Sequence, residues 1–219
     1  MNRFDLMAAT WEANPMRAER AQITADAIAA RVPLQPTWSV VDVGSGTGLL
    51  SRALAEHVGR VLLVDTSQGM TEVAAGNIAA DGATTLSAAC IDITSATPPG
   101  APFDLAVSLL MLHHVEDVTG FLESILSHLV PGGYIAFADV AAEDGTFHDD
   151  PTEDVQHRGF EPRHLAALAT SAGFVDVDVE EVHQMVKQRG GVPRTYGLLL
   201  LTGRVPALAP RPLSVSQGT

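Results

Sequence analysis

Through the first two-thirds of the chain, short apolar runs alternate with segments whose apolar residues recur at helical spacing. Strands that alternate with helices in this way build β-α-β units around a parallel sheet. Two of the runs, VLLV (61–64) and LAVSLL (105–110), are apolar at nearly every position, as in strands buried on both faces. The predicted strands are 38–43, 60–64, 85–91, 103–109 and 134–140, and the predicted helices are 11–32, 47–58, 67–79 and 117–130.

The pattern changes in the last third of the chain. Residues 174–179 read FVDVDV, a strict alternation that predicts a strand with one wet face near the edge of the sheet. Residues 196–203 follow as another strand with only a loop between, which predicts an antiparallel hairpin. We therefore expect an α/β fold with a doubly wound, mostly parallel seven-stranded sheet and a C-terminal antiparallel hairpin.

Proline, glycine and charge divide the chain into parts. Asn14 before Pro15 suits the cap and first position of a helix that ends before Pro33. The predicted parts are an N-terminal helical arm (1–36), a main domain (37–204) with an insertion (141–160), and a Pro/Ser-rich flexible tail (205–219).

Composition narrows the class of protein. The 219 residues are 46% hydrophobic, and 13 Lys and Arg against 26 Asp and Glu leave a net charge of −13. Such a charge disfavours nucleic acids and anionic membranes as partners. No apolar run approaches the roughly 18 residues of a membrane helix, and the N-terminus lacks a secretory apolar region, so we expect a cytoplasmic protein. The single cysteine, Cys90, excludes an intramolecular disulfide and is expected in the core.

The most informative segment is the glycine-rich turn VVDVGSGTGLL at 40–50, between a predicted strand and a predicted helix. Glycines let the backbone approach a ligand, and the helix start offers free N–H groups. The spacing is G-x-G-x-G, and Leu49 stands where the G-x-G-x-x-G loop that seats a pyrophosphate has its third glycine. The loop therefore favours a nucleoside ligand without phosphate.

Three acids stand where successive predicted strands end: Asp42, Asp65 and Asp92. The carboxyl ends of parallel strands meet at one edge of a sheet, where α/β proteins bind ligands, so the three are expected to line one crevice. Asp42 suits an ammonium group, and Asp65, 17 residues after Gly48, suits vicinal ribose hydroxyls. The implied ligand has an ammonium group, a ribose and an adenine.

At these residues the sequence resembles the class I S-adenosylmethionine-dependent methyltransferases. The resemblance rests on VVDVGSGTG, LVDTSQGM, ACIDI, FDLAVSLLMLHHVED and LVPGGYIAFAD, which cover roughly residues 38–140 in the family's order. The opening FDLMAATWEANPMR is similar to the arm of small-molecule members near the ubiquinone and menaquinone biosynthesis group. The resemblance implies a Rossmann-like methyltransferase fold and S-adenosyl-L-methionine as cofactor.

The resemblance also assigns roles, residue by residue. It implies that the glycine loop, with Asp42, holds the methionine part, that Asp65 holds the ribose, and that Met70, Asp92 and Ile93 surround the adenine. Ser108 would offer its backbone to the methionine part, and Trp11 with Arg17 would cover the cofactor as a lid. The cofactor-binding candidates are Trp11, Arg17, Asp42, Gly44, Ser45, Gly46, Gly48, Asp65, Thr66, Met70, Asp92, Ile93 and Ser108. Structural alternatives stay open: Asp42 and Asp65 as capping acids, and Trp11 as a hydrophobic staple.

His113 and His114 lie just beyond the fourth predicted strand, where they would face the methyl acceptor. A histidine there could act as a general base, and they are the catalytic candidates. The alternative is that one packs against the cofactor and the other caps the next helix.

The predicted insertion is unusually acidic, with seven acids and no Lys or Arg between Asp139 and Asp154. By position it should overhang the acceptor site. His148, Asp149, Asp150 and His157 are the acceptor-site candidates, either for recognising a cationic acceptor or as a base. A solvated loop is the plainer interpretation; the ligand types also permit a metal, although none is predicted.

The function that we expect is methyl transfer from S-adenosylmethionine to a small-molecule acceptor by in-line displacement. The alternatives are an NAD(P)-dependent oxidoreductase, because Asp65 after a glycine loop suits both folds, and a catalytically silent S-adenosylmethionine-binding interaction protein. Nothing in the sequence indicates which acceptor atom is methylated or the oligomeric state.

Overall fold

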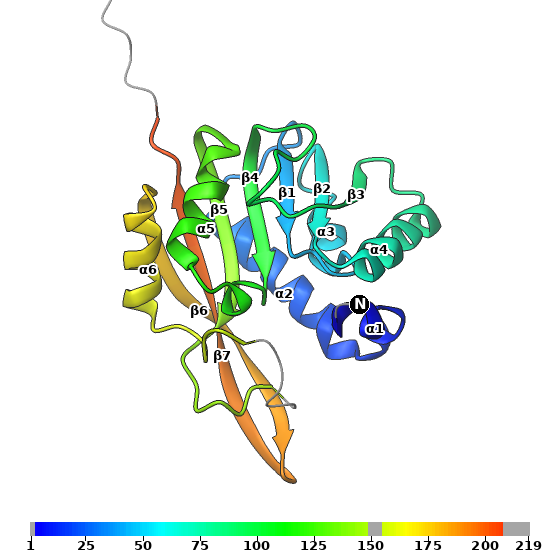
Figure 1. The fold of residues 1–219 in the computed structure, drawn as a ribbon, viewed down its shortest axis with the longest axis vertical. Coiled ribbons are helices and arrows are strands. Elements are labelled where there is room, and N and C mark those ends of the chain that lie inside the picture. Colours follow the sequence, from blue (N-terminus) through cyan, green and yellow to red (C-terminus); the bar gives the residue numbers. More distant parts are fainter. Residues whose placement is uncertain (1–2, 149–154, 208–219) are drawn as a thin grey trace, which may run out of the picture.

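A seven-stranded sheet forms the centre of the protein in a computed structural model, which describes residues 3–148 and 155–207 (Figure 1). The strand order is β3-β2-β1-β4-β5-β7-β6. The first five strands are parallel, and β7 runs antiparallel to both β5 and β6. The strands are β1 (Ser39–Val43), β2 (Arg60–Asp65), β3 (Leu86–Cys90), β4 (Phe103–Leu109), β5 (Leu129–Val140), β6 (Val175–Arg189) and β7 (Val192–Arg204).

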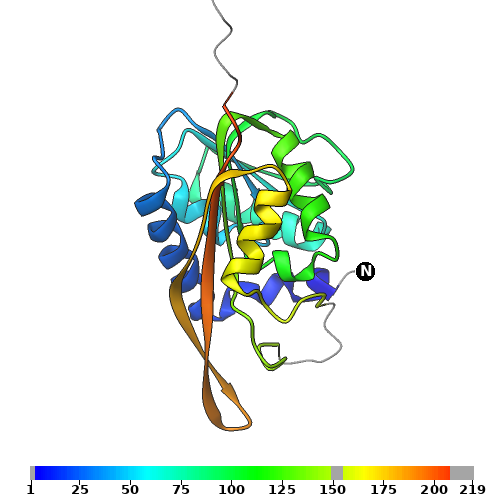
Figure 2. The ribbon, with the colours of Figure 1, turned by 90° about the vertical axis from the view of Figure 1, so that its left-hand side faces the viewer.

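The helices lie in two layers, one on each face of the sheet, as Figure 2 shows with α2 on one side and α5 and α6 on the other. The α-helices are α1 (Arg3–Met7), α2 (Pro15–Arg31), α3 (Leu49–Leu54), α4 (Gln68–Asp81), α5 (Val118–Ser127) and α6 (Pro162–Ser171). Two short 3-10 helices are η1 (Ala8–Ala13) and η2 (Leu112–His114). The predicted doubly wound fold with a C-terminal hairpin is confirmed.

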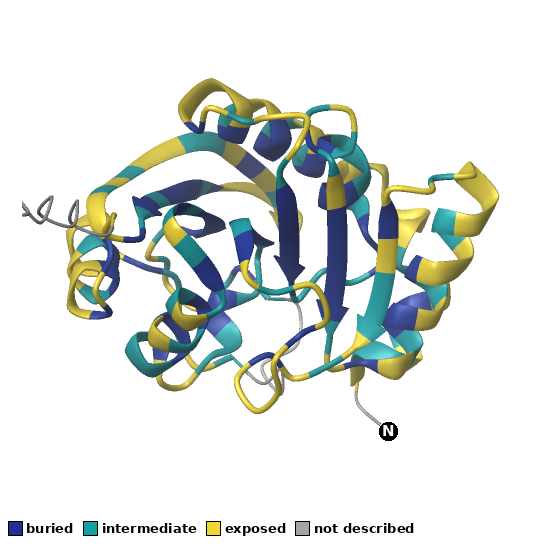
Figure 3. Cartoon of the chain, turned by 90° about the horizontal axis from the view of Figure 1, so that it is seen from above, coloured by how far each residue is buried: buried dark blue, intermediate teal, exposed yellow. Residues whose placement is uncertain are grey.

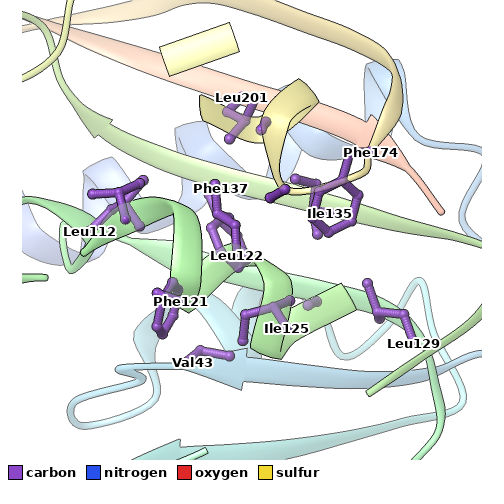
Figure 4. Packing of buried hydrophobic residues seen from close by; sticks show 14 of the residues in the cluster. Val43, Leu112, Phe121, Leu122, Ile125, Leu129, Ile135, Phe137, Phe174 and Leu201 are labelled. Carbon is purple, nitrogen blue, oxygen red and sulfur yellow. The ribbon is translucent and has the colours of Figure 1, made fainter. Parts of the chain in front are cut away.

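Successive strand residues supply two separate apolar cores, because side chains along a strand point alternately to opposite faces. Val40 packs in the core beneath α2 and α3, whereas Val41 packs in the core beneath α5 and α6. Figure 4 shows the second core, in which Leu122 of α5 lies beside Phe137 of β5 and Phe121 lies towards Val43 of β1. Figure 3 shows the consequence: the central strands are buried, and the outer surfaces of the helices are exposed.

The structure agrees with the predicted start of the first long helix and with the predicted edge strand. Asn14 caps α2 by accepting from the backbone N of Met16 at 3.1 Å, and Pro15 begins the helix. β6 lies at the sheet edge, where one face of its alternating sequence is exposed. Residues 208–219, most of the predicted tail, lie outside the described part of the chain.

Other details differ from the prediction. The helix after the glycine loop covers only Leu49–Leu54 rather than 47–58. β5 begins at Leu129, so Pro131 and Gly132 lie within a strand, beside a register shift against β4. Cys90 is exposed, because it ends β3 at the other edge of the sheet, so its predicted place in the core is wrong.

The hairpin is longer than predicted, and its length matters for the site. β7 pairs with β5 only from Leu198 to Arg204, and its remaining residues pair with β6 beyond the end of β5. The paired ends of β6 and β7 therefore project past the edge where the parallel strands end (Figure 1). The N-terminal arm, α1 and η1, lies below the same edge, so two extensions of the chain flank it.

Candidate functional site

The glycine loop fills the turn between β1 and α3, and its glycines all have positive φ. At Gly44 (φ +65°) a Cβ atom would lie 2.3 Å from Cγ of Met111, so only glycine admits the segment that follows β4. At Gly48 (φ +89°) a Cβ atom would lie 2.6 Å from Cδ2 of Leu63. Gly46 faces Trp11, whose Nε1 would lie 3.8 Å from such an atom. A side chain is therefore sterically excluded at Gly44 and Gly48, and the positive φ favours glycine at all three positions.

Asp42 lies buried beneath the loop, where its Oδ2 accepts a hydrogen bond from Oγ of Ser51 at 2.6 Å. Burial raises the pKa of Asp42 to about 7; the hydrogen bond from Ser51 opposes this change, and the charge of Asp65 adds to it. The carboxyl group therefore contacts α3 in this structure. The capping alternative and the cofactor role both remain compatible with its position.

Asp65 ties the glycine loop to the start of α4. Its carboxylate accepts from the backbone N of Gly46 at 2.8 Å and from the backbone N of Ser67 at 2.8 Å. Burial raises its pKa, while these hydrogen bonds act in the opposite direction. The charge of Asp65 also contributes to the raised pKa of Asp42.

Asp92 lies in an exposed turn two residues after β3 ends, next to Ile91, whose backbone N donates to the carbonyl of Asp65 at 3.0 Å. Its Oδ1 accepts from the backbone N of Thr94 at 2.9 Å and from its Oγ1 at 2.7 Å, and the hydroxyl bond lowers the pKa of Asp92. Its neighbour Ile93 is buried in the core, and the hydroxyl of Ser124 and the ring of His128 contact its carbonyl. The three predicted strand-end acids therefore do not all occupy equivalent positions.

The remaining cofactor candidates have distinct positions. Met70 is buried in α4, while Thr66 is exposed after β2. Ser45 donates its backbone N–H to the carbonyl of Val64 at 3.1 Å, and Ser108 donates its hydroxyl to the carbonyl of Val43 at 2.7 Å. These bonds hold the ends of β1, β2 and β4 together at one edge of the sheet.

The N-terminal arm closes over the glycine loop. The guanidinium of Arg17 stacks 3.6 Å from the centre of the Trp11 ring, and burial lowers the pKa of Arg17. Asp5 accepts from Oγ of Ser67 at 2.6 Å and from the backbone N of Gly69 at 3.0 Å. Glu12 pairs with Arg52 at 3.0 Å, and it also accepts from Asn77. Trp11 and Arg17 are identified from the sequence as part of the arm's contact with the loop. No local sequence feature identifies Asp5 and Glu12 as the residues that attach the arm to α4 and α3.

His113 and Asp139 form a buried pair across the ends of β4 and β5. Nδ1 of His113 lies 2.6 Å from Oδ1 of Asp139, and the backbone N of His113 donates to Oδ2 at 3.2 Å. Only 2% and 1% of these side chains are exposed. Asp139 begins the acidic stretch in the sequence, and its strand-end position is the signal that could have singled it out.

Two predicted histidines lie beside this pair, and a third contacts a neighbouring loop. The His114 ring centre lies 4.2 Å from that of His113 and 5.6 Å from that of Phe4 in the arm. The His148 ring centre lies 5.0 Å from that of His113. His157 instead contacts the carbonyl of Val115 through Nε2 at 2.9 Å, so its side chain holds two loops together. Asp149 and Asp150 lie outside the described residues.

The hairpin holds the described part of the insertion in place. The ammonium of Lys187 lies 3.7 Å from the centre of the Phe147 ring and donates to the Phe147 carbonyl at 2.7 Å. The ring of Tyr196 meets the other side of Phe147 at 5.3 Å, edge to face. A pocket of about 420 Å³ lies farther along the hairpin, lined by Ala141, Ala142, Glu143, Asp144, Arg194, Thr195, Tyr196 and Gly197. This pocket faces the outer hairpin rather than the glycine loop.

Two general findings limit the kind of site. Within residues 3–148 and 155–207, no group of three or more His, Cys, Asp or Glu side chains is placed to hold a metal ion. In the same ranges, no helix is both long and apolar enough to cross a membrane.

The fold and the site match a known family. The model of the methyltransferase domain family covers residues 16–179, so the chain belongs to this family. The resemblance to the class I S-adenosylmethionine-dependent methyltransferases is thereby confirmed, and the oxidoreductase alternative is set aside.

Individual relatives agree with this assignment. The chain is 35% identical over 101 residues to the ubiquinone biosynthesis O-methyltransferase of Coxiella burnetii, a match that covers 46% of this chain and 43% of the relative. It thus matches less than half of that protein's length. A methyltransferase solved with the Haloferax volcanii Trm112 methyltransferase activator has a TM-score of 0.75 at 22% identity, covering 94% of this chain and 99% of the other. The DhpI–SAH complex has a TM-score of 0.70 at 24% identity and covers 94% of both chains.

Proposed function

We propose that this protein transfers the methyl group of S-adenosylmethionine to a small-molecule acceptor by in-line displacement. The observation that supports this most directly is the carboxylate of Asp65, held at the glycine loop by the backbone N–H groups of Gly46 and Ser67. A carboxylate there can accept from ribose hydroxyls. Segment 42–51 contains Asp42 and no Lys or Arg, which suits an ammonium group better than a pyrophosphate.

Different residues of the chain would then bind different parts of the cofactor. Gly44, Gly46 and Gly48 would border the methionine part beside Asp42, Asp65 would hold the ribose, and Met70 would lie by the adenine. Trp11, stacked under Arg17 and facing Gly46, would cover the loop. When bound, the cofactor supplies a methyl group that its sulfonium charge already activates.

The protein's remaining tasks are alignment of the acceptor and exclusion of water. The arm, anchored to α4 through Asp5 and to α3 through Glu12, shields one side of the edge. Phe147, fixed by Lys187 and Tyr196 of the hairpin, shields the other side. A site enclosed in this way suits a small acceptor better than a macromolecule, and the net charge of −13 further disfavours nucleic acid.

Calorimetry tests the cofactor assignment. We expect S-adenosylmethionine to bind the full-length protein, and NAD to give no heat. Asp65→Asn should weaken cofactor binding about tenfold or more, because it removes the charge that accepts the ribose hydrogen bonds. The exposed Asp178→Asn on the edge strand β6 is the matched control, with an expected change below about threefold.

Release of S-adenosylhomocysteine with a panel of small hydroxyl, amine and thiol compounds tests the transfer itself. Product with at least one compound supports the proposal. Cofactor binding without product from any compound would favour the catalytically silent alternative.

A further inference from the structure

The contact between His113 and Asp139 uses only one of the two ring nitrogens of His113. Asp139 as a carboxylate accepts only, so the 2.6 Å contact places the ring proton on Nδ1 of His113. Nε2 of His113 then carries a lone pair, and this buried atom has no hydrogen-bond partner among residues 3–148 and 155–207. Buried polar atoms are normally paired, so an unpaired ring nitrogen calls for a ligand atom that can donate a proton to it.

The position of the pair relates it to the methyl-transfer site. Met111, two residues before His113, lies against Gly44 of the glycine loop. The ring of His114 contacts Phe4, and Phe4 contacts Trp11 at 6.1 Å between ring centres. The pair therefore lies next to the part of the loop assigned to the methionine portion and beneath the closed arm.

We propose that His113 is the general base of the reaction, that Asp139 is its positioning residue, and that the acceptor is a hydroxyl compound. This inference rests on the proposed methyl transfer. The acceptor oxygen forms a bond to the methyl carbon while the carbon–sulfur bond breaks and leaves its electron pair on sulfur. The hydroxyl proton passes to Nε2 of His113, and the positive charge lost by the sulfonium is retained on the imidazolium beside Asp139.

The chemistry of acceptors explains why a base points to oxygen. A neutral amine attacks with its own lone pair, and a thiol ionises readily near neutral pH. A hydroxyl group is a weak nucleophile until its proton is removed. Phenols, whose pKa is about 10, match an imidazole base better than aliphatic alcohols do. A phenolic hydroxyl is therefore the acceptor class that this pair serves best.

Several charged or titratable groups face the pair, each from a different element. His114 of η2 and His148 of the 141–148 segment lie beside the His113 ring. Asp139 also interacts with Arg20 of α2. The pKa of Arg20 is lowered to about 10, mainly by burial and also by the charge of Arg17, while the charge of Asp139 acts in the opposite direction. The Asp139 carboxylate thus has a guanidinium cation and an imidazole as neighbours.

Nitrogen NMR of the imidazole rings in the wild-type protein tests the geometry without any acceptor. The His113 signals, identified by their loss in His113→Gln, should show the proton on Nδ1 and a lone pair on Nε2 at neutral pH. Asp139→Asn should change this tautomer, because an amide can donate to Nδ1. A proton on Nε2 in the wild-type protein would overturn the proposal.

Kinetics with two probes tests the role of the base. Catechol presents a hydroxyl, and thiophenol presents a sulfur that ionises unaided. We expect His113→Gln to lower kcat for catechol about 10²–10³-fold and to change kcat for thiophenol less than about threefold. Asp139→Asn should lower kcat for catechol and leave KM nearly unchanged. The exposed His164→Gln is the control and should behave as wild type.

The outcomes separate the two proposals. Wild-type product with catechol, together with an unchanged catechol rate in His113→Gln, refutes the base and leaves methyl transfer standing. Wild-type product with thiophenol but none with catechol refutes the assignment of a phenolic acceptor. Equal losses with both probes also refute it, because the residue would then only support the fold. No product with any acceptor refutes methyl transfer, and the base proposal falls with it. Cofactor binding by calorimetry shows that each variant is folded.

Discussion

The two halves of the sheet edge are built in different ways. In the half formed by β1 and β2, Asp42, the glycine loop and Asp65 are joined by bonds between residues fewer than about 25 positions apart. In the half formed by β4, β5 and the hairpin, His113 meets Asp139 and Phe147 meets Lys187 across longer separations. The first half is therefore a local motif, and the second is assembled by the topology of the sheet.

This difference explains what each half can tolerate. A local motif depends on close approach of its own segments, so Gly44 and Gly48 admit no side chain. An assembled surface depends on side chains from several elements, so its residue types can vary as long as the elements meet. We expect the first half to fix the cofactor and the second to set the acceptor.

The largest expected effect is at the tightest point of the local half. Gly48→Val should lower the free energy of unfolding by about 5 kcal/mol, since it combines a β-branched residue at positive φ with overlap on Leu63. Gly190→Val at the hairpin tip has φ +58° but nothing within 4 Å, so it should cost only about 2 kcal/mol. Urea unfolding measures both. Equal losses would contradict the contrast between the halves.

The second prediction concerns pH and Asp42. Its pKa is about 7 in the folded protein and about 3.8 ordinarily, so the folded state binds the extra proton between these values. The free energy of unfolding should therefore fall by about 4 kcal/mol from pH 4 to pH 7 through this group, and then level off. Asp42→Asn should remove this contribution in urea titrations across that range, while the exposed Asp92→Asn should retain it.

The third prediction addresses the assembled half. Phe147→Ala should cost about 3 kcal/mol in unfolding free energy, because the ring is buried between Lys187 and Tyr196. It should also raise the acceptor KM about tenfold and leave the Kd of S-adenosylmethionine unchanged. Phe121→Ala, in the core under α5, should cost similar stability without raising the acceptor KM. Equal KM changes in the two variants would remove Phe147 from the acceptor site.

The smallest expected effect is at the arm. Glu12→Gln removes an ion pair with Arg52 in which both side chains are about one-third exposed, so its cost should be below about 1 kcal/mol. Cofactor affinity should fall about twofold to fivefold, because the arm is released from α3. Calorimetry measures this, with the exposed Glu19→Gln as control. A loss above about 30-fold would mean that Glu12 contacts the ligand directly.

The same contrast accounts for what the sequence could predict. Apolar runs and turn residues act locally, so the sheet, the glycine loop and the Asn14 cap were predictable from the sequence. The position of Cys90 was not, because burial depends on which strand lies at the edge. The pairing of Asp139 with His113 could not be predicted either. In the sequence, Asp139 looks like one more acid of the acidic stretch that it begins, and His113 lies 26 residues earlier. The projection of the hairpin depended on pairing lengths that alternation alone does not specify.

Lys187 is the only lysine in the chain, and its ammonium contacts the ring and the carbonyl of Phe147. Apart from the N-terminal amine, the protein therefore offers amine-reactive reagents a single side chain, located where the hairpin meets the 141–148 segment. A fluorescent label or crosslinker attached there would mark the junction between the hairpin and this segment. The composition thus provides a site-selective probe of the acceptor half without any engineered residue.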